Sequence, residues 1–232
     1  MRMKKNVLIT GASRGIGFYT ARLLLNKGCK VWALSRDAEG LERLRQDAQQ
    51  LPGELIGWNM SFAATDDVKK RLQAEGVALD VLINNAAQFQ QMNLEHYDDG
   101  RAKELFETNF FAALRLIKAA QPHFRRGAHV VNISSVGGLG GSAKFAELLI
   151  YSSSKGALNI ATECLAEDWR DEGYYCNALA LGSSSTEMFR AAFPGAEASS
   201  TPLQMAEYIV HFALNAPPLI NGQVISLRNG WR

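Results

Sequence analysis

The stretch ITGASRGIG, residues 9–17, is the part of the sequence that is most informative about the fold. It lies between a short apolar run and a helical pattern, so it marks the turn from a first strand into a first helix. Its glycines, Gly11, Gly15 and Gly17, follow a G-x-x-x-G-x-G spacing. Glycines in this context let backbone N–H groups approach a phosphate and present it to a helix N-terminus. The stretch therefore predicts the dinucleotide-binding loop of an α/β fold, and a tight turn without a ligand is the alternative.

The rest of the chain alternates short apolar runs with longer helical patterns. Most apolar runs show no strict alternation, which is typical of strands covered on both faces. The pattern predicts a Rossmann-type doubly wound parallel sheet of about seven strands with helices on both faces, in a single domain over residues 1–232. The predicted strands are Asn6–Thr10, Lys30–Leu34, Glu54–Trp58, Val81–Asn84, Ala128–Ser134, Tyr175–Leu179 and Gln223–Leu227. The predicted helices are Ile16–Asn26, Leu41–Gln50, Asp66–Ala74, Arg101–Phe124, Tyr151–Glu172 and Pro202–Asn215.

The composition is that of an ordinary globular protein. The 232 residues are 47% hydrophobic and carry a formal net charge of +2 without a run of like charges, so neither a nucleic-acid partner nor a membrane-surface partner is expected. No stretch approaches the roughly 18 apolar residues of a membrane helix. Cys29, Cys164 and Cys176 show neither metal-ligand spacing nor even pairing. We therefore expect no metal site and a reduced, cytoplasmic setting.

The segment YSSSK, residues 151–155, places a phenol and an ammonium four positions apart with only small residues between them. On a helix these two side chains share a face, and the charge of Lys155 is expected to lower the pKa of Tyr151 from its ordinary value near ~10. A tyrosine adjusted in this way is a usable general acid or base. The alternative is an incidental pair on a solvated helix face.

Taken together, the motifs resemble those of the short-chain dehydrogenase/reductase family. The resemblance rests on TGASRGIG at 10–17 and on the Tyr151-x-x-x-Lys155 pair. Further segments match that family's motifs in the same order: NNAA at 84–87, ETNFFAA at 107–113, VNISS at 131–135, NALALGSSSTEM at 177–188 and NGQVISLRNGW at 221–231. Each motif alone is weakly specific, but the set spans essentially the whole chain.

The resemblance implies four catalytic residues. Tyr151 would be the general acid/base, and Lys155 would adjust its pKa and bind the nicotinamide ribose. Ser135 would hydrogen-bond the substrate oxygen, and Asn109 would hold a water on a proton path. Ser134 remains an alternative to Ser135, because the interval to Tyr151 is longer than expected for the family. The intervening residues, 136–150, are predicted to form a mobile flap over the substrate.

The resemblance also implies a set of cofactor-binding residues, and the second strand indicates which cofactor they bind. That strand ends at Ser35 and Arg36 in place of an acidic residue, and a guanidinium there suits a 2′-phosphate. Arg14 is a second basic residue near the same group, whereas Asp37 lies too far along to be the usual acidic residue. We therefore predict NADP(H) rather than NAD(H). The implied cofactor-binding residues are Gly11, Ser13, Arg14, Gly15, Ile16, Gly17, Ser35, Arg36, Asn59, Met60, Asn85, Ala86, Ala87, Tyr151, Lys155, Gly182, Ser184 and Thr186.

Three positions depart from the family pattern. Asn59 replaces an aspartate near the adenine, Ala87 replaces a glycine beside the cofactor, and Leu181 replaces a proline before the nicotinamide segment. These changes are expected to affect affinity and loop order more than the chemistry. The resemblance also suggests residues that line the substrate pocket, namely Gln88, Phe89, Phe145, Met188, Phe189 and Phe193.

The leading hypothesis is an NADP(H)-dependent carbonyl reductase or alcohol dehydrogenase that acts on a small molecule. A catalytically silent NADP(H)-sensing regulator on the same fold is the alternative, although such a protein would be expected to lose Tyr151 or Lys155. A sugar-nucleotide epimerase or dehydratase shares Tyr-x-x-x-Lys, but the glycine spacing and the expected lack of a C-terminal substrate domain argue against it. The resemblance further implies a homodimer or homotetramer with contacts through residues 101–124 and 151–172.

Overall fold

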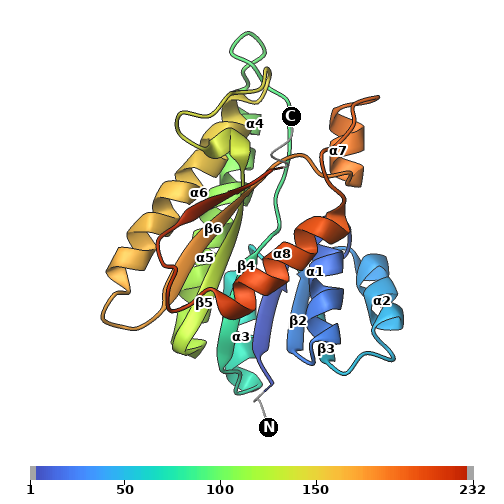
Figure 1. Ribbon diagram of the computed structural model, residues 1–232, viewed down its shortest axis with the longest axis vertical. Coiled ribbons are helices and arrows are strands. Elements are labelled where there is room, and N and C mark those ends of the chain that lie inside the picture. The colour runs from blue at the N-terminus through green and yellow to red at the C-terminus, as the bar shows by residue number, and fades with distance from the viewer. Residues whose placement is uncertain (1–3, 229–232) are drawn as a thin grey trace.

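The computed structural model of the protein describes residues 4–228 and places a seven-stranded sheet between two layers of helices (Figure 1). Every strand pair is parallel, and the strand order is β3-β2-β1-β4-β5-β6-β7. The chain therefore reverses its progress across the sheet between β1 and β4, and the predicted doubly wound parallel fold is confirmed. The strands are β1 (Asn6–Thr10), β2 (Lys30–Ser35), β3 (Glu54–Asn59), β4 (Leu79–Asn84), β5 (Phe124–Ser135), β6 (Tyr175–Leu181) and β7 (Val224–Leu227).

Helices cover both faces of the sheet, so each central strand is buried on two sides. In β1, Val7 and Ile9 belong to a core shared with α1, α2 and α8, whereas Leu8 belongs to a core shared with α3, α5 and α6. This alternation explains why the strand reads as continuously apolar. The helices are α1 (Gly15–Asn26), α2 (Ala38–Asp47), α3 (Thr65–Ala74), α4 (Asp99–Phe106), α5 (Ala112–Ala120), α6 (Leu149–Asp168), α7 (Glu187–Ala192) and α8 (Pro202–Asn215).

The long helix predicted over Arg101–Phe124 is confirmed up to Ala120, but it contains a π-helical segment and ends before Phe124. A π-helical segment, Glu107–Phe111, separates α4 from α5. After α5 a 3₁₀ turn, Gln121–His123, contains Pro122, and Phe124 already belongs to β5. Proline lacks the N–H that would continue the α-helical ladder, which accounts for the early end.

The start of α2 differs from the prediction because a side chain caps the helix earlier, and one short helix was not predicted. The Oδ1 of Asp37 accepts a hydrogen bond from the Gly40 backbone N–H at 2.9 Å, so α2 begins at Ala38 rather than Leu41. The unpredicted helix α7 has only six residues, too few to give a clear periodic pattern, and its N-cap is Thr186. The predicted start of α8 at Pro202 with Thr201 as its N-cap is confirmed.

The predicted flap, residues 136–150, begins with a 3₁₀ turn at Val136–Gly138 and ends inside α6. An isolated bridge between Met92 and Leu148 attaches it to the loop that follows β4. The backbone N–H of Met92 donates to the Glu147 carbonyl at 2.6 Å, and Glu147 has a φ of 61°. The last residues of the predicted 221–231 motif, 229–231, lie outside the described residues.

Candidate active site

The predicted site residues gather at one edge of the sheet, where the parallel strands have their carboxyl ends. Ser35, Asn59 and Ser135 are the last residues of β2, β3 and β5. Gly11 follows β1, and Gly182 follows β6. In an open α/β sheet the ligand crevice lies at this edge, at the point where the strand order reverses. Here that point lies at the carboxyl ends of the neighbouring strands β1 and β4.

The glycine loop is packed so closely that two of its glycines have no room for a side chain. Gly11 has a φ of +69°, a left-handed conformation that favours glycine. A Cβ on Gly17 would lie 2.2 Å from the Gly11 carbonyl oxygen and 2.4 Å from Asn85 Nδ2. The loop is therefore pressed against the start of α1 on one side and against the segment after β4 on the other.

Hydrogen bonds from the NNAA segment hold the glycine loop in place. Asn85 Nδ2 donates to the Thr10 carbonyl at 2.9 Å and to the Gly11 carbonyl at 3.3 Å. The Thr10 hydroxyl accepts from the backbone N–H groups of Asn85 and Ala86 at 3.1 and 2.9 Å. Sequence reasoning missed Thr10, and its position at the end of a strand before the glycines is the signal that could have found it. The side chain of Asn85 thus holds the loop, and Ala87 lies partly buried beside this anchor.

The start of α1 is suited to an anion. Arg14 occupies the N-cap position, and no side chain there accepts a hydrogen bond from the first turn, which contains Gly15 and Ile16. Free N–H groups at a helix start attract phosphate. The Arg14 guanidinium lies 3.7 Å from the Glu187 carboxylate, with both side chains well exposed. A dinucleotide pyrophosphate fits these residues.

The end of β2 brings together the residues predicted to choose between the two nicotinamide cofactors. Ser35 Oγ donates to Ser13 Oγ at 2.9 Å, and Ser35 is paired in register with Asn59. Met60 follows Asn59, and its backbone N–H donates to the Ser35 carbonyl at 2.9 Å. Arg36 is exposed and lines a small hollow of about 110 Å³. Asp37 is already engaged as the cap of α2, so Arg36 is the charged group presented at this strand end.

Tyr151 and Ser135 meet at the carboxyl end of β5. The Ser135 hydroxyl lies close enough to the phenol to lower its pKa, and Ser135 Oγ accepts a hydrogen bond from the Gly137 backbone N–H at 3.2 Å. Ser134 points the other way, since its hydroxyl is buried and donates to the Lys155 carbonyl at 3.2 Å. The geometry therefore favours Ser135 over Ser134 as the partner of the phenol.

The pKa of Tyr151 departs from the prediction. Burial of the phenol raises its pKa to about 12, and the neighbouring Ser135 hydroxyl acts in the other direction. The predicted lowering of this pKa is therefore wrong. The Lys155 ammonium lies 6.0 Å from the centre of the tyrosine ring and donates to the Ile133 carbonyl at 2.9 Å. Burial lowers the pKa of Lys155 itself to about 8.

The π-helical segment aims Asn109 at the loop after β4. Asn109 Oδ1 accepts from the Gln88 backbone N–H at 2.8 Å, and its Nδ2 donates to the Gln88 carbonyl at 2.9 Å. The same Nδ2 donates to Ser154 Oγ at 3.1 Å. Both amide hydrogens are then engaged, and only Oδ1 retains capacity for a water. Asn109 therefore anchors the loop that leads to Phe89, and a water-holding role stays a prediction.

The segment after β6 approaches the glycine loop closely. The Gly182 backbone N–H donates to the Leu227 carbonyl at 2.7 Å, which ties the segment to β7. Thr186 Oγ1 accepts from the Phe189 backbone N–H, and a Cβ on Gly15 would lie 3.5 Å from the Thr186 methyl carbon. The buried Ser184 hydroxyl has no hydrogen-bond partner within residues 4–228. An orphaned hydroxyl at this position fits a cofactor carboxamide.

The predicted substrate-side residues divide into two groups. Phe89, Phe189 and Phe193 form a connected set of rings with Tyr151. Phe145 and Met188 are 56% and 40% exposed and belong to no such ring cluster among the described residues. Within residues 4–228 no helix is long and apolar enough to cross a membrane, and no group of three or more histidine, cysteine or acidic side chains gathers.

Comparisons with known proteins agree with this arrangement. The sequence profile described as short chain dehydrogenase matches residues 5–197. Gluconate 5-dehydrogenase of Gluconobacter oxydans is 31% identical over 247 residues, which cover 96% of this chain and 93% of that protein. The rhamnolipids biosynthesis 3-oxoacyl-[acyl-carrier-protein] reductase of Pseudomonas aeruginosa is 31% identical over 248 residues, 97% of this chain and 94% of that protein. A short chain dehydrogenase from Burkholderia cenocepacia, solved in complex with NADP, superimposes with a TM-score of 0.88 at 25% identity and covers 99% of both chains.

Proposed function

This chain belongs to the short-chain dehydrogenase family, and from that premise we propose that it transfers a hydride between NADP(H) and a small carbonyl or alcohol substrate. One observation carries the proposal. A tyrosine lies beside the serine that ends β5 and near a buried lysine, at the same edge of the sheet as a glycine loop suited to a dinucleotide. The bound cofactor would supply the hydride, and the side chains would handle the proton.

The state of the phenol supports catalysis in the reductive direction. A pKa of about 12 keeps Tyr151 protonated at neutral pH, so it has a proton to give to a substrate oxygen. Ser135 and Tyr151 would donate to the same oxygen, which would orient the carbonyl. Lys155, with a pKa of about 8, is mostly charged at neutral pH and would stabilise the phenolate that remains.

The choice of NADP(H) is supported by the end of β2. Arg36 is exposed there, Ser35 is not acidic, and Asp37 is occupied by its helix cap. A guanidinium can pair with a 2′-phosphate through two parallel hydrogen bonds. The Burkholderia cenocepacia relative was solved with NADP, which agrees with this preference.

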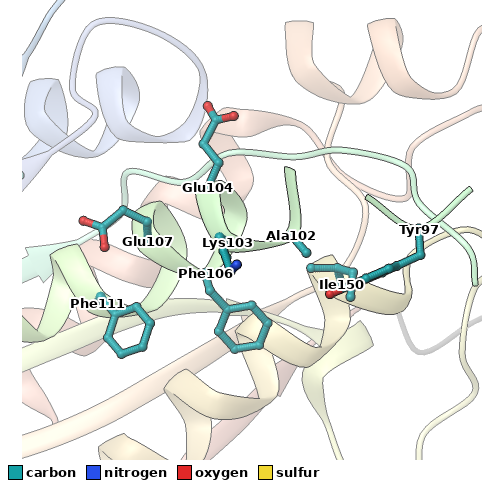
Figure 2. A pocket seen from close by; sticks show the side chains of 8 residues that line it. All are labelled: Tyr97, Ala102, Lys103, Glu104, Phe106, Glu107, Phe111 and Ile150. Carbon is teal, nitrogen blue, oxygen red and sulfur yellow. The ribbon is translucent and has the colours of Figure 1, made fainter. Parts of the chain in front are cut away.

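We further propose that the protein forms a homo-oligomer through α4, α5 and α6. A hollow of about 610 Å³ lies at this surface, and Phe106, Phe111 and Ile150 are among the residues that line it (Figure 2). Phe111 is 47% exposed, and Ile160 on α6 is 60% exposed. Exposed apolar groups that gather in this way are typical of a contact surface. The cytoplasmic setting stays a prediction.

The test of the proposed function compares the parent protein with Tyr151→Phe. Each is mixed with NADPH and a panel of ketones, aldehydes, quinones and β-ketoacyl thioesters, and NADPH absorbance is followed. Loss of the proton donor is expected to lower kcat by roughly 10²–10⁴-fold while NADPH binding persists. Tyr208→Phe, on the exposed face of α8, is the matched control and is expected to be neutral. Cofactor binding without turnover of any carbonyl would favour the silent regulator.

A further inference from the structure

The rings around the Tyr151 phenol come from two loops that are far apart in the sequence. Phe89 follows β4, and its ring centroid lies 4.9 Å from that of Tyr151 with the planes tilted by 59°. Phe193, at the end of α7, lies 5.6 Å from Phe89 in an edge arrangement. Phe189, on α7, lies 5.3 Å from Phe193. We call Tyr151, Phe89, Phe193 and Phe189 the aromatic row.

Hydrogen bonds hold both loops of the aromatic row in place. The residue before Phe89 is Gln88, whose backbone N–H and carbonyl are both bound by the Asn109 amide. The Gln91 side chain donates to the carbonyl of Ala192, the residue before Phe193, at 3.2 Å. The three phenylalanine side chains are nevertheless only partly buried, so part of each ring is accessible to a ligand.

We infer that the aromatic row selects substrates whose carbonyl group is attached to an aromatic ring, such as aryl ketones and aryl aldehydes. The inference rests on the proposed function, because Tyr151 is what brings the reacting oxygen to the row. Because the Phe89 ring centroid lies 4.9 Å from that of Tyr151, a carbonyl held by the tyrosine hydroxyl would have its substituent beside the row. Aromatic pairs favour tilted and edge-to-face arrangements with centroids roughly 4.5–7 Å apart, the spacing that the row already shows.

The preference is expected to come from the π-system and not from size alone. A saturated ring buries a similar apolar area but lacks the quadrupole that makes aromatic pairs favourable beyond their burial. That extra attraction corresponds to a preference of about threefold to tenfold. The rings of the row carry no cation, so a substrate carboxylate would gain no ion pair from them.

The test compares acetophenone with cyclohexyl methyl ketone, its saturated counterpart, with NADPH as the reductant. In the parent protein kcat/KM is expected to favour acetophenone by about threefold to tenfold. In Phe89→Leu, which keeps an apolar side chain but removes the ring, the ratio is expected to fall toward one. The matched control is Phe124→Leu. It removes a ring from a different aromatic cluster, with Trp169 and Tyr174, at the opposite end of β5 from Ser135.

A binding measurement separates this inference from the proposed function. Saturation-transfer NMR in the presence of NADP⁺ reports whether acetophenone binds in preference to the saturated ketone, without any need for turnover. Equal binding and equal kcat/KM for the two ketones in the parent protein, or an unchanged ratio in Phe89→Leu, overturns the inference and leaves hydride transfer standing. Ring-selective binding that Phe89→Leu removes, without turnover of any carbonyl in the panel, supports the aromatic row and overturns the proposed function.

Discussion

Lys155 shows how a single residue can cost stability at a site where it is useful. The residue is only 2% exposed, and burial lowers its pKa to about 8. Because the ordinary value is 10.5, the unfolded chain binds this proton more readily than the folded chain between about pH 8 and pH 10.5. The contribution of this group to stability is therefore complete above pH 10.5 and is lost as the pH falls through 8.

We predict that Lys155→Met stabilises the cofactor-free protein at pH 7. Removing the buried charge is expected to raise the free energy of unfolding by about 3 kcal/mol. Loss of the hydrogen bond to the Ile133 carbonyl is expected to lower it by about 1 kcal/mol. Urea unfolding would measure a net gain of about 2 kcal/mol, together with loss of turnover. Lys69→Met, on an exposed position of α3, is the control. A Lys155→Met protein no more stable than the parent would contradict the view that the buried Lys155 charge destabilises the fold.

Arg36 is the residue on which cofactor preference is expected to depend. Replacing it with aspartate removes a partner for the 2′-phosphate and places a like charge near it, so Arg36→Asp should weaken NADPH binding by at least about tenfold more than NADH binding. Fluorescence titration with both cofactors measures the difference. Arg43→Asp changes the net charge equally from an exposed position on α2 and should affect both cofactors alike. Equal losses for the two cofactors in Arg36→Asp would refute the assignment.

At the scale of elements, the junction of β1 and α1 is the most tightly specified part of the site. We predict that Gly17→Ala lowers stability by about 1–3 kcal/mol and abolishes tight cofactor binding, because its Cβ would meet a backbone oxygen at 2.2 Å. Thermal unfolding and cofactor titration measure the two effects. Gly57→Ala on β3, where the nearest atoms would be 4.0 Å away, is the control and should be nearly neutral. A Gly17→Ala protein that binds cofactor normally would contradict the prediction, because it would show that the loop can move to accommodate the added methyl group.

The same scale shows what could be predicted from the sequence. The strands were predictable because two helical layers make them continuously apolar, and Thr201 with Pro202 marked the start of α8. The π-helical segment was not predictable, since a single wider turn inside a helix has no residue signature comparable to a proline or a capping side chain. The same holds for the contact of Asn109 with Gln88, which depends on that segment. The pKa of Tyr151 was predicted in the wrong direction because burial, which raises it, cannot be read from a five-residue motif.

At the scale of the whole molecule, the exposed apolar face of α4, α5 and α6 predicts assembly. We expect light scattering to find a dimer or tetramer, and Phe111→Glu to shift it toward smaller species because a carboxylate would be buried at the contact. Met188→Glu, at a side chain of similar exposure on α7, is the control and should leave the mass unchanged. A parent protein that is monomeric at micromolar concentration would rule out this surface as a stable interface.

The strand order has a consequence for how this protein can change over time. The segments that carry the three phenylalanines of the aromatic row leave the sheet where β4 and β6 end, whereas the two cores lie along the strands behind them. Exchanges within residues 93–97 and 187–199, which are exposed or only partly buried, therefore leave the buried layers and the predicted cofactor-binding residues intact. A library randomised in those two segments should yield mostly folded variants with new substrate tolerance, so the scaffold can acquire new chemistry by loop exchange while its proton-handling centre is retained.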